Sequence, residues 1–137
     1  MLVMDDLVQL GKTERFEDWR GNLKTLTCRL GYSNFLLGVK PGPGAPSQQV
    51  LIQSNYPVTW RNHYDSQAYA AIDPIVHHCL NSNLPLLWNR ENYRQPAESA
   101  FFEEAAMHGL QLGLALPLHG PRGEAGMFCL KPYERGP

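Results

Sequence analysis

The residues best suited to chemistry lie in one short region, where several large aromatic side chains surround a single acid. Residues 55–64 read Asn-Tyr-Pro-Val-Thr-Trp-Arg-Asn-His-Tyr, and Asp73 and Trp88 follow shortly afterwards. Tyrosine and tryptophan rings bury apolar area while their polar tips still donate hydrogen bonds. A carboxylate among such rings is costly to bury unless donors surround it. This combination is typical of the polar end of a closed, mostly apolar small-molecule pocket.

Other kinds of site receive little support. His77 and His78 are adjacent on a predicted helix and point in different directions, so they cannot form the i, i+4 pair of a metal site. The sequence contains no Gly-x-Ser-x-Gly, His-Glu-x-x-His or phosphate-binding loop. His63, Asp65 and Cys79 could be combined into a nucleophilic set, but no local motif supports that combination. We therefore expect no enzyme, no metal and no cofactor.

Composition and length restrict the function further. The chain has 137 residues, 43% hydrophobic and 18% charged, which predicts one globular core. The formal net charge of −1 gives no electrostatic footprint of a DNA-binding surface. No basic start or long apolar run is found, so we expect a cytoplasmic protein without signal peptide or membrane span. Cys28, Cys79 and Cys129 form no Cys-x-x-Cys, which predicts reduced, partly buried thiols.

The first part of the chain predicts one helix and a pair of strands. Thr13 is expected to cap a helix that Gly31 ends, with apolar residues at helical spacing between them. Residues 32–39 read as a largely buried strand, in which Gly38 indicates close approach by another group. After a loop rich in proline and glycine, residues 50–53 read as a second strand, antiparallel to the first.

The remaining sequence predicts several helices and then a hairpin. The expected elements are a helical turn opened by Pro57, a helix from Asp73–Pro74 to about Asn81, a helix over 96–108, and a hairpin of 112–118 with 125–130; residues 84–86 are a candidate fifth strand. Aspartate before proline is a strong helix start, with the acid at the N-cap. This order predicts an α+β fold with an antiparallel sheet.

Asn55 to Leu130 resembles the ligand-binding domain of LuxR-family quorum-sensing regulators, most closely the LasR branch. The matching pieces are Asn55-Tyr-Pro-x-x-Trp-Arg-x-His-Tyr-Asp65, Asp73-Pro74, His78-Cys79, Leu84-Pro85 with Trp88, Phe101-Phe-Glu-Glu-Ala105, Gly109-Leu110 and Pro117-Leu-His-Gly-x-Arg-Gly-Glu124. Leu30-Gly-Tyr-Ser33 and Leu36 to Gly38 fit as well, so the resemblance covers nearly the whole chain. It implies an α-β-α sandwich whose five-stranded antiparallel sheet, with helices on both faces, encloses an N-acyl-homoserine lactone.

The resemblance also implies roles at the polar head of that ligand. Asp73 matches the acid that accepts from the amide N–H, Trp60 the indole that donates to the lactone carbonyl, and Tyr56 the phenol that donates to the amide carbonyl. On the residues alone, Asp73 is more readily a helix cap and each ring a core aromatic; one carboxylate can serve both roles. Trp88 matches the ring that packs on the lactone, although core packing explains it nearly as well.

The other matched positions surround the amide and the acyl tail. Tyr64 and Arg61 match the lining of the head and the start of the tail, with a surface cation as an equal alternative for Arg61. Cys129 replaces the serine of the LasR branch and predicts a weaker contact, because a thiol is a weak donor. Ile75 and Ala115 replace threonines and make the pocket more apolar. The implied tail lining is Leu36, Gly38, Val50, Ile52, Val76, Tyr93, Phe101, Ala105, Leu110 and Met127, all ordinary core without a ligand. Such a lining favours a long acyl chain.

Compared with the family pattern, residues 1–137 form an autoinducer-binding domain alone, without a helix-turn-helix DNA-binding domain. We therefore expect a small-molecule autoinducer as partner, and neither nucleic acid bound by this chain alone nor a membrane. One hypothesis is a sensor that forms a homodimer, or a heterodimer that antagonises a full-length receptor. The alternative is an interaction-only or degenerate fragment without ligand binding. Lack of the family's next helix predicts an exposed apolar patch.

Overall fold

A computed structural model describes residues 15–133 of the chain. Its elements are α2 (Phe16–Arg29), β1 (Tyr32–Lys40), β2 (Leu51–Ser54), α3 (Val58–Ser66), the 3-10 turn η1 (Tyr69–Ala71), α4 (Pro74–Asn81), β3 (Leu86–Trp88), the 3-10 turn η2 (Arg90–Asn92), α5 (Pro96–Met107), β4 (Gly113–His119) and β5 (Ala125–Pro132). This order confirms the predicted α+β class.

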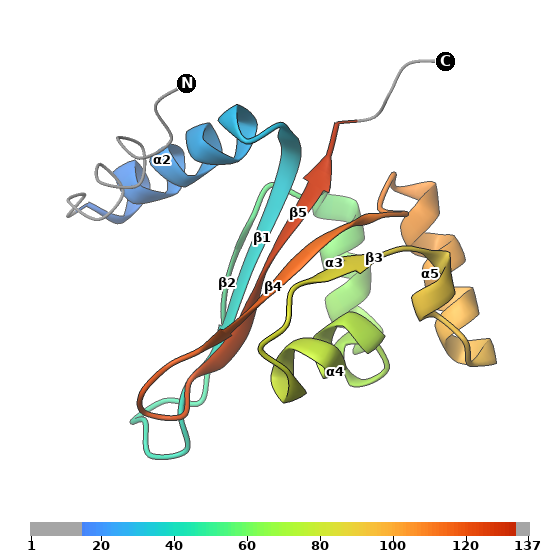
Figure 1. The fold of residues 1–137 in the computed structure, drawn as a ribbon. Coiled ribbons are helices and arrows are strands. Elements are labelled where there is room, and N and C mark those ends of the chain that lie inside the picture. Colours follow the sequence, from blue (N-terminus) through green and yellow to red (C-terminus); the bar gives the residue numbers. More distant parts are fainter. Residues whose placement is uncertain (1–14, 134–137) are drawn as a thin grey trace.

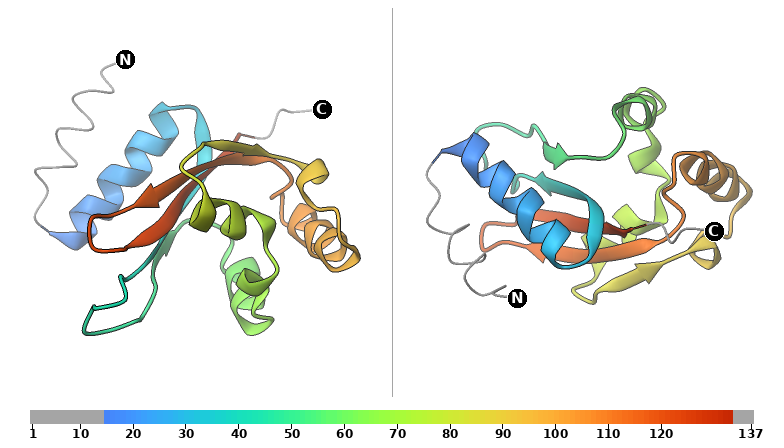
Figure 2. Two further views of the ribbon diagram at one scale, coloured as in Figure 1. Left: turned by 60° about the horizontal axis from the view of Figure 1, so that its bottom comes forward. Right: turned by 90° about the horizontal axis from the view of Figure 1, so that it is seen from above.

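The five strands form one antiparallel sheet in the order β2-β1-β5-β4-β3. Helix α2 lies on one face, whereas α3, α4 and α5 gather on the other (Figure 1; Figure 2). The predicted α-β-α arrangement with helices on both faces is therefore confirmed. The fifth strand is β3, which begins at Leu86 and not at Leu84. Pro85 lacks the N–H that a paired strand residue needs, so pairing starts after it.

The sheet separates two apolar cores, because successive strand residues point to opposite faces. Phe35 faces α2 and packs in a cluster with Leu23 and Leu130. Its neighbour Leu36 faces the other way and belongs to a larger cluster that contains Trp60. The larger cluster lies under α3, α4 and α5, on the side that carries the predicted site.

The ends of the helices follow local backbone chemistry. Gly31 and Gly109 adopt positive φ angles of 93° and 79° directly after α2 and α5, which glycine tolerates without strain. The Asp73 side chain accepts from the Ile75 N–H at the start of α4, as predicted. Helix α2 begins at Phe16 with Arg15 at its N-cap; the predicted cap at Thr13 lies outside the described residues.

One prediction of local detail is wrong, and another holds in part. A Cβ at Gly38 would have one atom within 4 Å, Leu36 Cδ2 at 3.7 Å, so nothing approaches that position closely. Between β1 and β5, close packing requires glycine at Gly126, where a Cβ would lie 2.1 Å from the Gly38 carbonyl oxygen. Among the three thiols, Cys28 is exposed, because the helix turns it away from the sheet, while the other two are buried.

Candidate functional site

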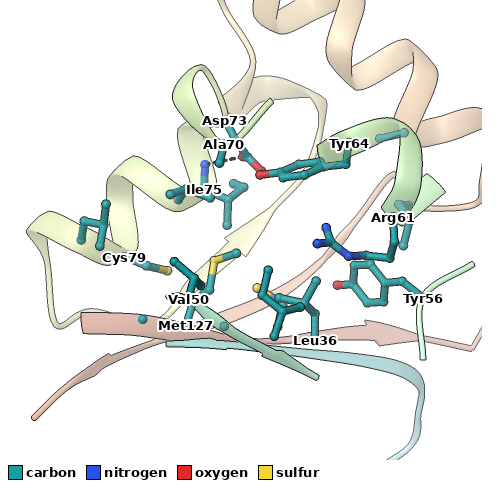
Figure 3. Close-up of a pocket in the computed structure, with 18 of the residues that line it drawn as sticks. Leu36, Val50, Tyr56, Arg61, Tyr64, Ala70, Asp73, Ile75, Cys79 and Met127 are labelled. Carbon is teal, nitrogen blue, oxygen red and sulfur yellow. Dashed lines mark hydrogen bonds between the residues drawn. The ribbon is translucent and has the colours of Figure 1, made fainter. Parts of the chain in front are cut away.

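A cavity of about 450 Å³ lies between the sheet and the helices on its larger-core side (Figure 3). Its size falls in the range of small-molecule pockets, about 300–1,000 Å³. The lining is Leu36, Gly38, Lys40, Val50, Ile52, Tyr56, Trp60, Arg61, Tyr64, Ala70, Ala71, Asp73, Ile75, Val76, Cys79, Leu80, Trp88, Tyr93, Phe101, Ala105, Leu110, Ala125, Gly126, Met127 and Cys129. The cavity is therefore mostly apolar, with a few polar groups.

Every residue predicted for the ligand site lines this cavity except Ala115. Ala115 is fully buried within the sheet, opposite Leu86 and Cys129. Its small side chain ends in the core packing and does not reach the cavity surface.

Sequence reasoning missed seven lining residues: Lys40, Ala70, Ala71, Cys79, Leu80, Ala125 and Gly126. Strand alternation from Leu36 and Gly38 indicates Lys40, and helical spacing from Ile75 and Val76 indicates Cys79 and Leu80. No pattern in the sequence indicates the others, which are Ala70 and Ala71 in η1 and Ala125 and Gly126 in β5.

Asp73 is held at the roof of the cavity by two hydrogen bonds. Its Oδ1 accepts from the Ile75 N–H at 2.9 Å and its Oδ2 accepts from the Tyr64 hydroxyl at 2.8 Å. The residue is only 7% exposed, and this desolvation raises the pKa of its carboxyl despite the hydrogen bonds from Tyr64 and Ile75. A carboxylate has about four acceptor positions, so Asp73 can cap α4 and still accept from a ligand donor.

Tyr56 points its hydroxyl into the cavity opposite that roof (Figure 3). The hydroxyl oxygen is buried and has no hydrogen-bond partner among the described residues. Burial raises the pKa of this phenol well above its ordinary value, so the hydroxyl stays protonated and can donate. Because buried polar groups are nearly always paired, an unpaired donor facing a cavity indicates a missing partner.

Trp60 is fixed by a ring cluster between α3, η1 and α5. The indole is 3% exposed and packs at centroid distances of 5.9 Å from Tyr64, 6.1 Å from Tyr69 and 5.6 Å from Phe101. Behind it, the Glu104 carboxylate accepts from the Tyr69 hydroxyl and lies 3.0 Å from His63 Nε2. This polar cluster links the three elements that hold the indole in place.

Arg61 lies at the cavity and not on the open surface. Its side chain is 14% exposed, its guanidinium lies 5.1 Å from the centre of the Tyr64 ring, and Nη2 is 2.9 Å from Asp65 Oδ1. Figure 3 shows the guanidinium turned toward Tyr56. The alternative of a simple surface cation is therefore wrong.

Trp88 and Cys129 complete the inner end of the cavity. A Cβ at Gly113 would lie 2.2 Å from Trp88 Cη2, so the missing side chain at Gly113 makes room for this ring. Burial raises the pKa of the Cys129 thiol well above its ordinary value and that of Cys79 to about 11, which keeps both neutral. Cys129 is thus a weak donor at best.

Between Arg15 and Tyr133, no cluster of three or more histidine, cysteine, aspartate or glutamate side chains could hold a metal ion. Over the same range, none of the helices combines the length and apolar character needed to cross a bilayer.

Comparison with known proteins gives one consistent family. The model of the autoinducer binding domain matches residues 15–135. The transcriptional activator VanR of Vibrio anguillarum is 35% identical over 112 residues, which are 82% of this chain and 47% of VanR. AnoR of Acinetobacter nosocomialis, also a transcriptional activator, is 32% identical over 79% of this chain and 45% of its own length. The chain thus spans about half the length of these curated relatives.

Solved structures show the same fold. SdiA of Escherichia coli superposes with a TM-score of 0.81 at 23% identity, covering 98% of this chain and 56% of SdiA. CepR2 of Burkholderia cenocepacia, described as an N-acylhomoserine-lactone-dependent LuxR-family transcription factor, gives 0.79 at 22% identity over 96% of this chain and 76% of CepR2. VanR, AnoR and CepR2 are described as transcription regulators and not as enzymes. With the family model matching residues 15–135, this chain belongs to the autoinducer-binding domains of the LuxR-type quorum-sensing regulators.

Proposed function

We propose that this domain binds an N-acyl-homoserine lactone, with the amide and lactone held at the inner end of the cavity. The observation that carries the proposal is the buried, unpartnered hydroxyl of Tyr56, which faces the same apolar cavity as the Asp73 carboxylate. A ligand that brings an acceptor to Tyr56 and a donor to Asp73 would satisfy both groups. An acyl amide carries one of each.

The family resemblance supports a specific assignment of these contacts. Tyr56 donates to the amide carbonyl, Asp73 accepts from the amide N–H, and Trp60 donates to the lactone carbonyl. Burying an amide without partners costs about 1–3 kcal/mol per unpaired group. These three side chains therefore select the head group, while Cys129, as a neutral thiol, adds little to the amide carbonyl.

The lining favours a long acyl chain. Each buried methylene contributes about 0.8 kcal/mol, and most of the side chains beyond the head-group region are apolar. We also propose that the site is most similar to those of the LasR branch, on the sequence matches from Asn55 to Glu124.

In the cell, we place this domain in the cytoplasm as the sensor of a quorum-sensing transcription regulator, as its relatives are named transcriptional activators. We also propose that it forms heterodimers with full-length receptors and thereby antagonises them. The second candidate is an interaction-only or degenerate form. Its support is the weak donor Cys129 and a cavity that opens to solvent at Val50 and Ile52, which are 48% and 39% exposed.

Thermal melting with homoserine lactones of increasing acyl length tests the proposal. Ligand at 100 times its Kd stabilises the folded state by about 2.7 kcal/mol. We expect a rise in Tm that grows with chain length and is reduced in Asp73→Asn and Trp60→Phe. Asp18→Asn and Trp19→Phe, on α2 beyond the cavity, are the matched controls. No rise with any lactone would leave the interaction-only form.

A further inference from the structure

The cavity floor extends along β1 in two-residue steps. Leu36, Gly38 and Lys40 share the face that lines the cavity. Their partners on neighbouring strands are Ser54 and Cys129 for Leu36, Ile52 and Met127 for Gly38, and Ala125 for Lys40. At 3.3–3.4 Å per residue, the floor measures about 13 Å from Leu36 to Lys40.

The two ends of this floor differ in exposure. At the inner end, Leu36 and Trp60 are 6% and 3% exposed. At the outer end, Lys40 is exposed, and Val50 and Leu80 are 48% and 39% exposed. The cavity therefore opens to solvent at the Lys40 end.

Helix α4 follows the same direction as the floor. Ile75, near its start, is 4% exposed, whereas Leu80, near its end, lies at the rim. His119 Nε2 contacts the carbonyl oxygen of Cys79 at 2.9 Å, and His119 is paired with Ala125 in the sheet. These contacts place the last turn of α4 beside the sheet row of Lys40 and Ala125.

Lys40 is the cation of this outer end, and it has no ion-pair partner within residues 15–133. The other cavity-lining side chains around it, Val50, Leu80 and Ala125, are apolar. Glu124 is the acid next in sequence to Ala125, the partner of Lys40, and its side chain accepts from the Arg122 N–H at 2.7 Å. An uncompensated ammonium group thus stands at the mouth of an apolar channel.

We propose that Lys40 forms a second polar subsite, which binds a carboxylate at the far end of a linear acyl chain. This inference rests on the proposed function, with the head group of the same ligand at Tyr56 and Asp73. Gly38 makes the path continuous, because its missing side chain leaves the middle of the floor bare. A ligand with polar groups at both ends and an apolar chain between them matches this sequence of residues.

The test uses two homoserine lactones of equal acyl length, one ending in a methyl group and the other in a carboxylate. Binding is measured by calorimetry on the full chain and on Lys40→Met and Lys40→Glu. Lys24→Met, an exposed lysine on α2, is the matched control. We expect Lys40→Met to weaken the carboxylate ligand by about 1.4-fold to fivefold and to change the affinity for the methyl ligand less, since exposed ion pairs contribute about 0.2–1 kcal/mol.

Charge reversal and salt sharpen the outcome. Lys40→Glu should disfavour the carboxylate ligand more strongly than Lys40→Met does. High salt should reduce the effect, because the Debye length falls from about 10 Å at 0.1 M to about 3 Å at 1 M. Equal effects of Lys40→Met on both lactones, or none on either, would overturn the subsite.

The methyl-ended lactone separates this inference from the proposed function. If it fails to bind the wild-type chain, the proposed function fails. If it binds and the Lys40 variants do not discriminate, only the subsite fails. A free fatty acid of matched length is the third ligand. A different result is that the Lys40 variants weaken binding of the fatty acid but leave the carboxylate-ended lactone unaffected. That result would overturn the proposal of a ligand with two polar ends and would assign Lys40 to fatty-acid binding.

Discussion

Removing the hydroxyl of Tyr56 should have opposite effects on the stability of the empty domain and on ligand affinity. The Tyr56 hydroxyl is buried without a partner among the described residues, whereas the Tyr64 hydroxyl donates to Asp73 at 2.8 Å. Tyr56→Phe and Tyr64→Phe make the same chemical change in the same cavity. They therefore form a matched pair that differs in hydrogen bonding.

The expected magnitudes follow from that difference. A buried polar group without a partner costs about 1–3 kcal/mol, and water in the empty cavity recovers part of this cost. Tyr56→Phe should therefore change the free energy of unfolding by between zero and about +2 kcal/mol. Tyr64→Phe breaks a hydrogen bond to a carboxylate and should lower it by about 1.5–3 kcal/mol. With ligand, Tyr56→Phe should lose about 0.5–1.5 kcal/mol of binding, or about twofold to twelvefold in Kd.

Urea unfolding of both variants, with and without a long-chain homoserine lactone, measures these quantities. The informative result is the sign for Tyr56→Phe in the empty domain. A loss of about 1 kcal/mol or more there, matching Tyr64→Phe, would mean that the Tyr56 hydroxyl already has a strong partner. The reasoning that assigns it to a ligand would then be refuted.

Three further predictions concern glycines and acids. Gly126→Ala should lower the free energy of unfolding, measured in urea, by about 1–3 kcal/mol, because its Cβ would lie 2.1 Å from the Gly38 carbonyl oxygen. Gly38→Ala should fold normally, and calorimetry should show that it selectively weakens the binding of long-chain lactones. Gly113→Ala should displace Trp88 from the inner end of the cavity and weaken lactone binding at every chain length. The tryptophan fluorescence spectrum should change as well, and an unchanged spectrum would contradict the displacement. The pH dependence of unfolding should separate two carboxyls. The pKa of Asp73 is raised above 3.8 by burial, so its contribution to stability is greatest below that pH and falls as pH rises through the folded value. The pKa of Glu104 is lowered from 4.5, chiefly by the hydrogen bonds from Tyr69 and His63, so its contribution is present above 4.5 and is lost as pH falls through the folded value. Asp73→Asn and Glu104→Gln should therefore remove slopes of opposite sign, the second one small because the Glu104 side chain is 43% exposed and solvent screens it.

Local chemistry made most of the fold predictable. The boundaries of α2, α4 and α5 could be predicted closely, because local backbone chemistry sets them. Asp73 caps the start of α4 before Pro74, and Gly31 and Gly109 adopt positive φ angles after α2 and α5. Strand β3 was harder to place, because a three-residue strand carries too little alternation to show where pairing begins. Gly126 is crowded and Gly38 is not, although they lie on adjacent strands, because the close approach of the Gly38 carbonyl depends on how the two strands pack.

The candidate site was predictable where side chains lie on regular elements. The family resemblance placed Leu36 and Gly38 as well as the polar residues of the head-group end, and the strand brings the first two to one face. Ala115 does not line the cavity, because facing the same side of the sheet does not guarantee access to it. Lys40 was missed because a lysine at the end of a strand normally marks solvent, and only the length of the cavity brings it into the lining.

The division of the interior by the sheet has a consequence for the empty receptor. The cluster of Leu23, Phe35 and Leu130 under α2 shares no residue with the cavity lining. Losing the signal therefore removes packing from one half of the molecule only, and local opening should be confined there. Amide exchange in α2 should be nearly indifferent to lactone, while α3 and α4 gain protection. Without ligand, we therefore expect local unfolding on the side of α3 and α4 and expect proteases to cleave the chain first near α4.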